Sequence, residues 1–323
     1  MGDKVSVIIP VFQVERYIRQ CVESLRTQTY DHLEFVFVND GSTDHSMDIL
    51  MEILEADPSF KSKSKIINLD HQGLPAARMA GIAATTGDWI IHVDSDDWVE
   101  PDYIKLLAEA AKEEGADVAY CDFIKEYDTR KVSKIDREND FSPSDGHEAL
   151  KALHNSRIRA YMWNKLIHRS LYDAVKLFPP ICGYHEDIVF QTQLLYNAKK
   201  CVHVHQALYH YRKFRKGALT SVGLIKARRQ SAANMLSLYD ALPEKDSPKE
   251  VVGIDLLWRG GWYCAIIMAW KMLSSHKEAV EALLAADYKR DYRVSLGKQA
   301  YTKLICRLIH LTQKEGDQKV KMT

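Results

Sequence analysis

The stretch Trp89-Ile90-Ile91-His92-Val93-Asp94-Ser95-Asp96-Asp97-Trp98 joins a short apolar run to three carboxylates within four residues. Its β-branched residues predict a buried strand, and Pro101 shortly afterwards predicts the start of a helix. Carboxylates at the end of a strand lie where open α/β sheets bind their ligands. Asp94 and Asp96 repel each other unless a cation neutralises them, so the stretch predicts a divalent metal site. A solvated helix N-terminus, where Asp is also favoured, is the alternative.

Strand and helix patterns alternate on both sides of this stretch. Apolar runs predict strands at 4–9, 33–38, 65–69, 89–93 and 117–121, and helical spacing predicts helices at 14–26, 46–54, 73–84 and 101–114. Pro10 is expected to end the first strand. Alternation of this kind predicts βαβ units, and therefore an α/β fold with a mostly parallel sheet and right-handed crossovers.

The pattern changes after residue 125. We expect an exposed hairpin or loop at 125–140, a helix opening at Glu186-Asp187, two short strands at 201–205 and 208–212, and helices beyond 217. These changes divide the chain into three parts. The parts are an alternating strand and helix region at 1–125, a mixed region at 126–221 and a C-terminal helical region at 222–323.

Composition excludes several broad classes of protein. Lys and Arg number 44 and Asp and Glu also number 44, so no overall field favours nucleic acid as a partner. Six scattered cysteines without a C-x-x-C pair predict reduced thiols, which is typical of the cytosol. No basic leader with an apolar core precedes the first strand, and charges or glycines interrupt every long apolar stretch. We therefore expect a cytoplasmic protein.

Other charged side chains follow the same edge of the predicted sheet. Asp40 ends the second strand, as Asp94 follows the fourth, and Glu15 follows the first. Carboxylates gathered there indicate a nucleotide pocket, in which one accepts from a base or ribose and another holds a cation. Arg78 opens the next helix, where it would meet a phosphate. A helix cap for Asp40 and a surface position for Arg78 are the alternatives.

Together these motifs resemble those of family 2 glycosyltransferases of the GT-A fold. In chain order they are Val5–Pro10 with Phe12 and Glu15, Gln28-Thr29-Tyr30, Asn39–Asp44, Ala77-Arg78 with Gly81, and the D-x-D motif within Asp94–Asp97. The resemblance is strong over residues 4–125 and weaker to 221. It implies a Rossmann-like GT-A domain, with a nucleotide-sugar-binding half at 1–125 and an acceptor-binding half at 126–221, followed by the C-terminal helical extension at 222–323. Met79 and Ala218 depart from the family pattern, which places the loop after Arg212 in doubt as a diphosphate clamp.

The resemblance also implies roles for the site residues. Asp40 would bind the uracil of a UDP-sugar, Asp96 would ligate Mn²⁺ or Mg²⁺ on the diphosphate, and Asp94 would contact ribose or metal-bound water. The full nucleotide-binding set is Pro10, Val11, Phe12, Glu15, Asp40, Arg78, Asp94 and Ser95.

Transfer to an acceptor hydroxyl needs a base, and Glu186-Asp187 resembles the family's acidic pair. We assign Asp187 as the base and Glu186 as the neighbour that orients the acceptor or the helix. A capping acid pair is the alternative. Further residues resemble elements around the acceptor and the phosphates, although Trp163 and Tyr211 fit a core position equally well. This set is Trp163, Lys165, His185, Tyr211 and Arg212.

Two further patterns have competing interpretations. Cys201, His203 and His205 alternate along a strand and would suit zinc, but without a second ligand pair we favour packed strand residues. The helix expected at 300–314 is amphipathic and basic. Most such helices pack on their own domain, and the alternative is peripheral docking on the cytoplasmic membrane face.

The sequence thus predicts a metal-dependent inverting glycosyltransferase. It would move a sugar from a UDP-linked donor to a glycan or lipid-linked hydroxyl acceptor, in polysaccharide or cell-surface glycan synthesis. The alternatives are a catalytically inactive nucleotide-sugar-binding scaffold and a phosphatase of the haloacid dehalogenase type. The phosphatase fits poorly, because its D-x-D follows the first strand and Trp98 here replaces the expected Thr or Val.

Overall fold

A computed structural model describes residues 2–127, 132–136, 142–154, 156–175, 177, 179–180 and 183–213, with seven single positions between 230 and 241. The chain divides into two compact units, Met1–Val222 and Gly223–Thr323, and every named element belongs to the first. The helix expected at 300–314 lies outside the described residues, and the three-part division of the sequence stays a prediction.

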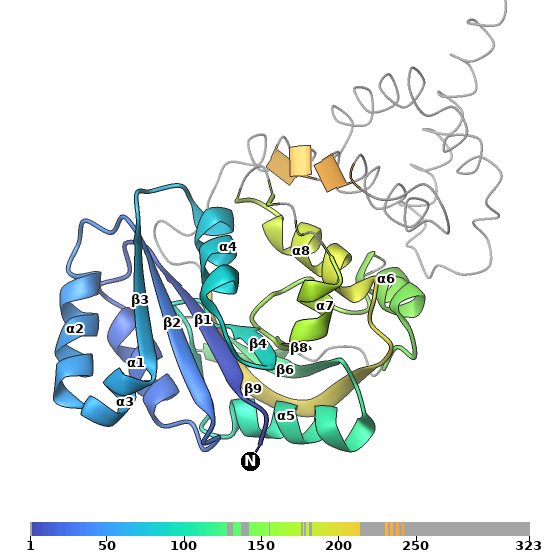
Figure 1. The fold of residues 1–323 in the computed structure, drawn as a ribbon, viewed down its shortest axis with the longest axis horizontal. Coiled ribbons are helices and arrows are strands. Elements are labelled where there is room, and N and C mark those ends of the chain that lie inside the picture. Colours follow the sequence, from blue (N-terminus) through green and yellow to red (C-terminus); the bar gives the residue numbers. More distant parts are fainter. Residues whose placement is uncertain are drawn as a thin grey trace, which may run out of the picture. The chain divides into compact units, whose positions relative to one another are not determined.

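The first unit is built on one mixed sheet, shown in Figure 1. Its strands are β1 (Val5–Val11), β2 (Leu33–Asp40), β3 (Ser64–Leu69), β4 (Trp89–His92), β5 (Trp98–Val99), β6 (Val118–Tyr127), β7 (Val132–Asp136), β8 (Lys165–His168) and β9 (Cys201–Arg212). The helices are α1 (Ile18–Arg26), α2 (Ser46–Ala56), α3 (Pro58–Ser62), α4 (Leu74–Ala84), α5 (Tyr103–Glu114), α6 (Gly146–His154), α7 (Arg169–Asp173) and α8 (Glu186–Leu195).

The strand order is β3-β2-β1-β4-β8-β6-β9-β5, and β7 pairs with β6. Strands β3, β2, β1 and β4 are parallel to one another, which confirms the predicted βαβ units. The sheet becomes mixed at β8, which is antiparallel to both β4 and β6. This arrangement is the α/β fold expected from the sequence.

Three expectations about element bounds were wrong. β1 continues through Pro10, because β4 pairs with β1 only as far as Ile8, and a proline is tolerated where a strand has a neighbour on one side only. Helix α1 begins at Ile18, since the preceding residues form a turn closed on the Val14 carbonyl. The two short strands expected after residue 200 are one strand, β9, whose pairing with β6 shifts register at Asp122.

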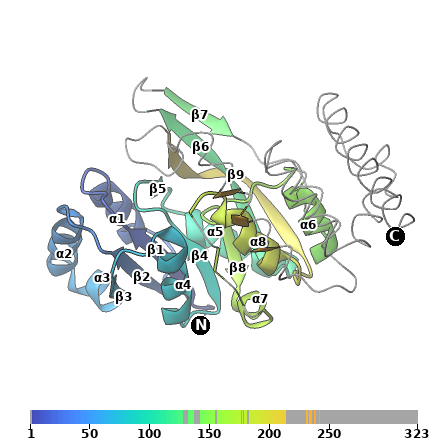
Figure 2. The ribbon, with the colours of Figure 1, turned by 90° about the horizontal axis from the view of Figure 1, so that it is seen from above.

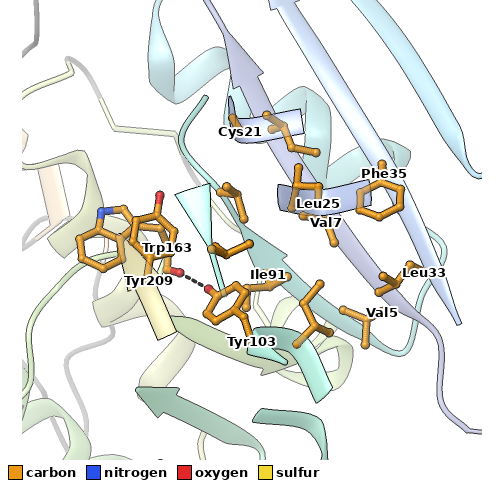
Figure 3. Close-up of a cluster of buried hydrophobic side chains, with 14 of the residues drawn as sticks. Val5, Val7, Cys21, Leu25, Leu33, Phe35, Ile91, Tyr103, Trp163 and Tyr209 are labelled. Carbon is orange, nitrogen blue, oxygen red and sulfur yellow. Dashed lines mark hydrogen bonds between the residues drawn. The ribbon is translucent and has the colours of Figure 1, made fainter. Parts of the chain in front are cut away.

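Helices cover both faces of the parallel strands (Figure 1), so β1, β2 and β4 are buried on both sides, whereas the edge strand β3 is partly exposed. Alternate residues of β1 and β2, including Val7 and Phe35, face the main core with α1, α2 and α5 (Figure 3). The other face packs against α4. Gly81 allows this contact, because a Cβ atom there would clash with the Ile8 side chain. Helix α4 therefore lies close enough to β1 to bring Arg78 over the end of β4.

Candidate active site

The turn after β4 holds the three clustered carboxylates in different environments. Asp94 and Asp96 are half-exposed, whereas Asp97 is buried. The Tyr209 hydroxyl donates to Asp97 Oδ2 at 2.9 Å and accepts from the Asp94 backbone N–H at 3.1 Å. Burial raises the pKa of Asp97, and the charges of Asp96 and Asp94 raise it further. Asp97 thus anchors the turn to β9, whereas Asp94 and Asp96 stay partly exposed.

Arg212 strengthens the same anchor. Its backbone N–H donates to Asp97 Oδ1 at 2.7 Å, and its Nε donates to the Asp96 carbonyl at 2.9 Å. The guanidinium lies 4.8 Å from the ring centroids of both Tyr17 and Trp98. We expected Arg212 near the phosphates or the acceptor, and the structure places it beside the D-x-D turn, where it holds the turn's backbone.

Arg78 differs most from its expected placement. It lies in the middle of α4 and its side chain is 2% exposed, so it does not open the helix toward solvent. Its Nη2 lies 2.9 Å from Asp94 Oδ1, and its Nε lies 3.5 Å from Glu186 Oε1. Burial alone would lower the pKa of Arg78, but these carboxylates raise it. One buried cation therefore joins the D-x-D turn to the start of α8.

The acidic pair at the start of α8 is the part of the site most distant in sequence from β4. Glu186 is buried, and burial together with the charge of Asp187 raises its pKa. Asp187 is half-exposed, and its Oδ1 accepts from the Ile188 backbone N–H at 2.8 Å. His185 precedes the pair with φ of 59°, a left-handed conformation that is strained for a non-glycine residue. The predicted convergence of the Glu186-Asp187 segment on the D-x-D turn is therefore present.

Asp40 lies at the same edge, at the end of β2. Its carboxylate accepts from the backbone N–H groups of Gln72 at 2.8 Å and Gly73 at 2.9 Å, just before α4. His71 Nδ1 lies 2.9 Å from Asp40 Oδ2, and the His71 ring stacks on Phe12 with centroids 4.1 Å apart. Phe12 is 37% exposed. The expected base-binding carboxylate thus has an exposed aromatic pair beside it.

The other residues assigned to the nucleotide are less exposed. Pro10, Val11 and Ser95 are buried, so any contact with a nucleotide would come from their backbones. Glu15 is exposed, but its carboxylate accepts from the His45 N–H at 3.2 Å, next to the start of α2. Their proposed contacts stay predictions.

The residues assigned to the acceptor divide into buried and half-exposed groups. Trp163 is 3% exposed and stacks between Tyr161 and Tyr209. Figure 3 shows Trp163 beside Tyr209. Trp163 therefore occupies the core position that was the alternative to an acceptor contact. Lys165 is also buried, and its Nζ donates to the carbonyls of Arg159 and Tyr161 and to the Asn164 side chain. Lys165 therefore supports the 159–164 loop from inside instead of facing an acceptor. Among the residues assigned to the acceptor, Tyr211 is half-buried and lies beside Tyr161 at the surface.

Sequence reasoning missed two residues of the site. Asp97 was quoted within the motif without a role, and Tyr209 was one of two tyrosines in an alternating strand. The period of two in β9 was a usable signal, because it places Tyr209 and Tyr211 on one face. The hydrogen bond that selects Tyr209 as the partner of Asp97 spans 112 positions of the chain and left no local pattern.

The zinc interpretation of β9 finds no support in the described part of the chain. His203 Nε2 lies 2.9 Å from Asp122 Oδ1 and its ring stacks on Tyr120, as expected for a packed strand residue. Over the described ranges, no three His, Cys, Asp or Glu side chains are grouped to hold a metal by themselves.

Comparison with known sequences gives a consistent family. The family model described as Glycosyl transferase family 2 matches residues 6–176. "Putative glycosyltransferase EpsH" of Bacillus subtilis is 39% identical over 212 residues, which cover 64% of this chain and 60% of that protein. "Glycosyltransferase GlyA" of Streptococcus pneumoniae is 31% identical over 253 residues, 76% of this chain and 34% of that protein. The chain thus spans about a third to three fifths of these relatives.

Solved structures share the fold. Residues 1–349 of TarS from S. aureus in complex with UDP match with a TM-score of 0.62 and 18% identity, over 97% of this chain and 92% of that chain. The mannosyltransferase PcManGT from Pyrobaculum calidifontis, in complex with GDP-Man and Mn²⁺, matches with a TM-score of 0.55 and 17% identity. That match covers 97% of this chain and 88% of the mannosyltransferase.

Proposed function

This chain belongs to glycosyltransferase family 2, and from this premise we propose that it transfers a sugar from a UDP-sugar to an acceptor hydroxyl with inversion at the anomeric carbon. The observation that carries the proposal is the pairing of buried Arg78 with both Asp94 and Glu186. This cation brings a strand-end carboxylate suited to a nucleotide next to an acidic pair suited to proton transfer. A donor and an acceptor bound at these two places would be adjacent.

The donor base is proposed to lie beside Asp40. Asp40 is 3% exposed and both its oxygens accept from backbone N–H groups, so a UDP uracil there would lie against the stacked rings of Phe12 and His71 and reach the carboxylate only at its edge. The exposed ring of Phe12 supports this placement, because large exposed aromatic side chains are typical of binding sites. Gln13, directly after Phe12, has φ of 52°, and strained backbone of this kind gathers at functional sites.

The D-x-D turn fits a hard divalent cation on the donor diphosphate. Asp94 and Asp96 are half-exposed, and their charges act on the buried Asp97 next to them, so the turn carries excess negative charge. Mg²⁺ and Mn²⁺ prefer oxygen ligands, and Mg²⁺ commonly takes one or two protein carboxylates together with substrate phosphates. We assign Asp96, supported by Asp94, to hold this ion. Once bound, the ion would act as a Lewis acid on the departing diphosphate.

Asp187 is proposed as the base. A carboxylate within hydrogen-bond reach of the acceptor hydroxyl takes its proton as the oxygen attacks the sugar. Glu186 is buried against Arg78, whereas Asp187 is half-exposed, so Asp187 is the carboxylate that an acceptor hydroxyl could reach. Glu186 instead holds the start of α8 to Arg78. Direct attack by the acceptor oxygen, with a single displacement at the anomeric carbon, gives inversion.

The test is Mn²⁺-dependent turnover of a panel of UDP-sugars, with GDP-mannose included because a structural neighbour binds it. We expect hydrolysis or transfer with at least one UDP-sugar. Asp96→Ala should weaken Mn²⁺-dependent UDP binding, and Glu109→Gln, at an exposed position on α5, is the control that should not. UDP-sugar binding without turnover, with acceptors supplied, would instead indicate an inactive scaffold.

We also propose that the enzyme acts in the cytoplasm in glycan synthesis, with a glycan or lipid-linked acceptor. Among the described residues, no helix is long and apolar enough to cross a bilayer. Membrane docking through the helix expected at 300–314 stays a prediction, because that segment lies outside the described residues. The test is liposome flotation of the whole chain, compared with a version ending at Leu296. If neither protein floats with the liposomes, membrane docking is excluded.

A further inference from the structure

One surface near the D-x-D turn has no role in the mechanism above. Strands β6 and β9 pair in parallel with Lys125 opposite Tyr211 (Figure 2). Because side chains alternate along a strand, Tyr209, Tyr211 and Lys213 share one face, and His210 and Arg212 share the other. We name the surface formed by Tyr161, Tyr211, Lys125, Arg159 and Lys213 the aromatic–cationic face.

The aromatic part of this face continues directly from the proposed active site. Tyr161 and Tyr211 are half-buried, with ring centroids 5.8 Å apart, and both rings pack on buried Trp163. Burial raises the pKa of Tyr211, and the charges of Asp97, Asp94 and Asp96 contribute, so the ring lies within electrostatic reach of these acids. Half-exposed rings beside a sugar-transfer site suit a sugar face, which stacks on aromatic side chains.

The cationic part lies beyond the rings. The Lys125 ammonium pairs with Asp136, and Arg159 Nη2 lies 3.9 Å from the same carboxylate. Lys213 Nζ lies 4.2 Å from the Tyr211 ring centroid, and within the described part of the chain it forms no ion pair. Burial and the charge of Lys125 both lower the pKa of Lys213. The charges of Asp97 and Asp136 act in the opposite direction, and a bound anion would add to them beside Lys213.

Spacing along β9 connects the two parts. Strand residues rise about 3.4 Å each, so the Lys213 Cα lies roughly 14 Å from the Cα of Tyr209, which contacts the D-x-D turn. The Lys213 side chain reaches back to the Tyr211 ring, so a sugar beside this ring would lie within reach of its ammonium.

We propose that the aromatic–cationic face binds the acceptor, and that this acceptor is an anionic glycan whose phosphate or carboxylate is held by Lys213 and Lys125. The inference rests on the proposed glycosyl transfer and specifies its acceptor class. Tyr161 and Tyr211 receive the sugar nearest the reacting hydroxyl, and the two lysines receive the charged group beyond it.

The experiment measures acceptor binding to the full chain by calorimetry with UDP and Mn²⁺ present. The probes are a tetrasaccharide containing glucuronic acid, its carboxyl-reduced neutral counterpart, and a glycerol phosphate tetramer. At least one anionic probe should bind about 10-fold more tightly than the neutral one, the scale of one charge-assisted hydrogen bond. Whether the carboxylate or the phosphate probe binds identifies the source of the charge.

Lys213→Met should remove this preference, and Lys213→Arg should keep it. Lys112→Met, on an exposed part of α5, is the matched control and should change nothing. Unchanged thermal melting of each variant establishes that it is folded. Equal binding of charged and neutral probes by the unaltered chain, or an unchanged preference in Lys213→Met, overturns the proposal.

A loss of UDP affinity alone in Lys213→Met would also overturn it, because Lys213 would then serve the donor diphosphate. Failure of glycosyl transfer itself is recognised separately, by the absence of turnover in the unaltered chain with every donor of the panel above.

Discussion

The two halves of the sheet place their polar side chains in different ways. In β3, β2, β1 and β4, Asp40 ends its strand and Asp94 follows its strand closely, so parallel pairing alone brings both to one edge. In β8, β6 and β9, the groups that complete the site reach it through distant contacts. Tyr209 bonds to the Asp94 N–H across 115 positions of the chain. The first half of the site is thus encoded locally, and the second half depends on the assembled tertiary structure.

The largest expected effect tests the role of the distant half. Asp187→Asn should lower the rate of sugar transfer about 100-fold or more, the usual scale for a general base, because the amide cannot accept the acceptor proton. Binding of UDP with Mn²⁺ should persist, since the local half of the site is unchanged. Transfer kinetics and UDP calorimetry on the same sample measure both.

Glu186→Gln is the informative comparison for Asp187→Asn. It keeps the shape of a buried side chain that contacts Arg78 and does not take the acceptor proton in our assignment, so its transfer rate should fall much less. If Asp187→Asn transfers sugar at the normal rate, the base has been assigned to the wrong residue.

The next effect concerns the packing that supports the local half. Gly81→Ala should destabilise the chain by about 1–3 kcal/mol, because the added methyl group overpacks α4 against Ile8 on β1. The loss should outweigh the gain in helix propensity, which is up to about 1 kcal/mol. Urea unfolding measures it. Ala83→Ser, at an exposed position of the same helix, should stay within about 0.5 kcal/mol, and a more stable Gly81→Ala would contradict the packing argument.

The same contrast explains what the sequence could predict. Apolar runs and helical spacing fixed the parallel strands and placed Asp40 and Asp94 at one edge, because both signals are local. Arg78 was predicted to face a phosphate, since nothing near it in the sequence shows that Glu186 approaches from α8. Lys165 was assigned to the acceptor from its place in a motif that resembles the family's, whereas its ammonium is buried among carbonyl oxygens of its own loop. Charged residues that are buried by tertiary packing look like surface residues in a local pattern.

A smaller effect tests the anchor between the two halves. Tyr209→Phe removes the hydroxyl that bonds to the Asp94 N–H and to Asp97, so the D-x-D turn should loosen. We expect Mn²⁺-dependent UDP affinity to fall about 5- to 10-fold, the scale of one ordinary hydrogen bond. Tyr30→Phe removes a hydroxyl that bonds to the Asp3 carbonyl, and it should leave UDP affinity unchanged. Equal UDP affinity in both variants would show that the turn holds its shape without β9.

The smallest effect tests the other end of the local half, where buried Glu34 ties β2 to its neighbours. Its carboxylate accepts from Ser6 Oγ at 2.6 Å, the Thr86 N–H at 2.5 Å and Lys4 Nζ at 2.8 Å. Burial alone would raise the pKa of Glu34, but these donors outweigh it and lower the pKa below its ordinary value of 4.5. The folded state therefore binds this proton less readily than the unfolded state, so the contribution of Glu34 to stability is present above about pH 4.5 and is lost as the pH falls further.

The Glu34→Gln variant has no such pH-dependent contribution, because the glutamine side chain does not ionise. The free energy of unfolding is measured with urea near pH 6 and near pH 3.5. From the higher to the lower pH, the unaltered chain should lose about 1 kcal/mol more than the variant does, the scale of one net hydrogen bond. Glu109→Gln, at an exposed position, should follow the unaltered chain. If the Glu34→Gln and unaltered curves fall in parallel, then Ser6, Thr86 and Lys4 do not favour the ionised carboxylate, and this end of the sheet is held by apolar packing alone.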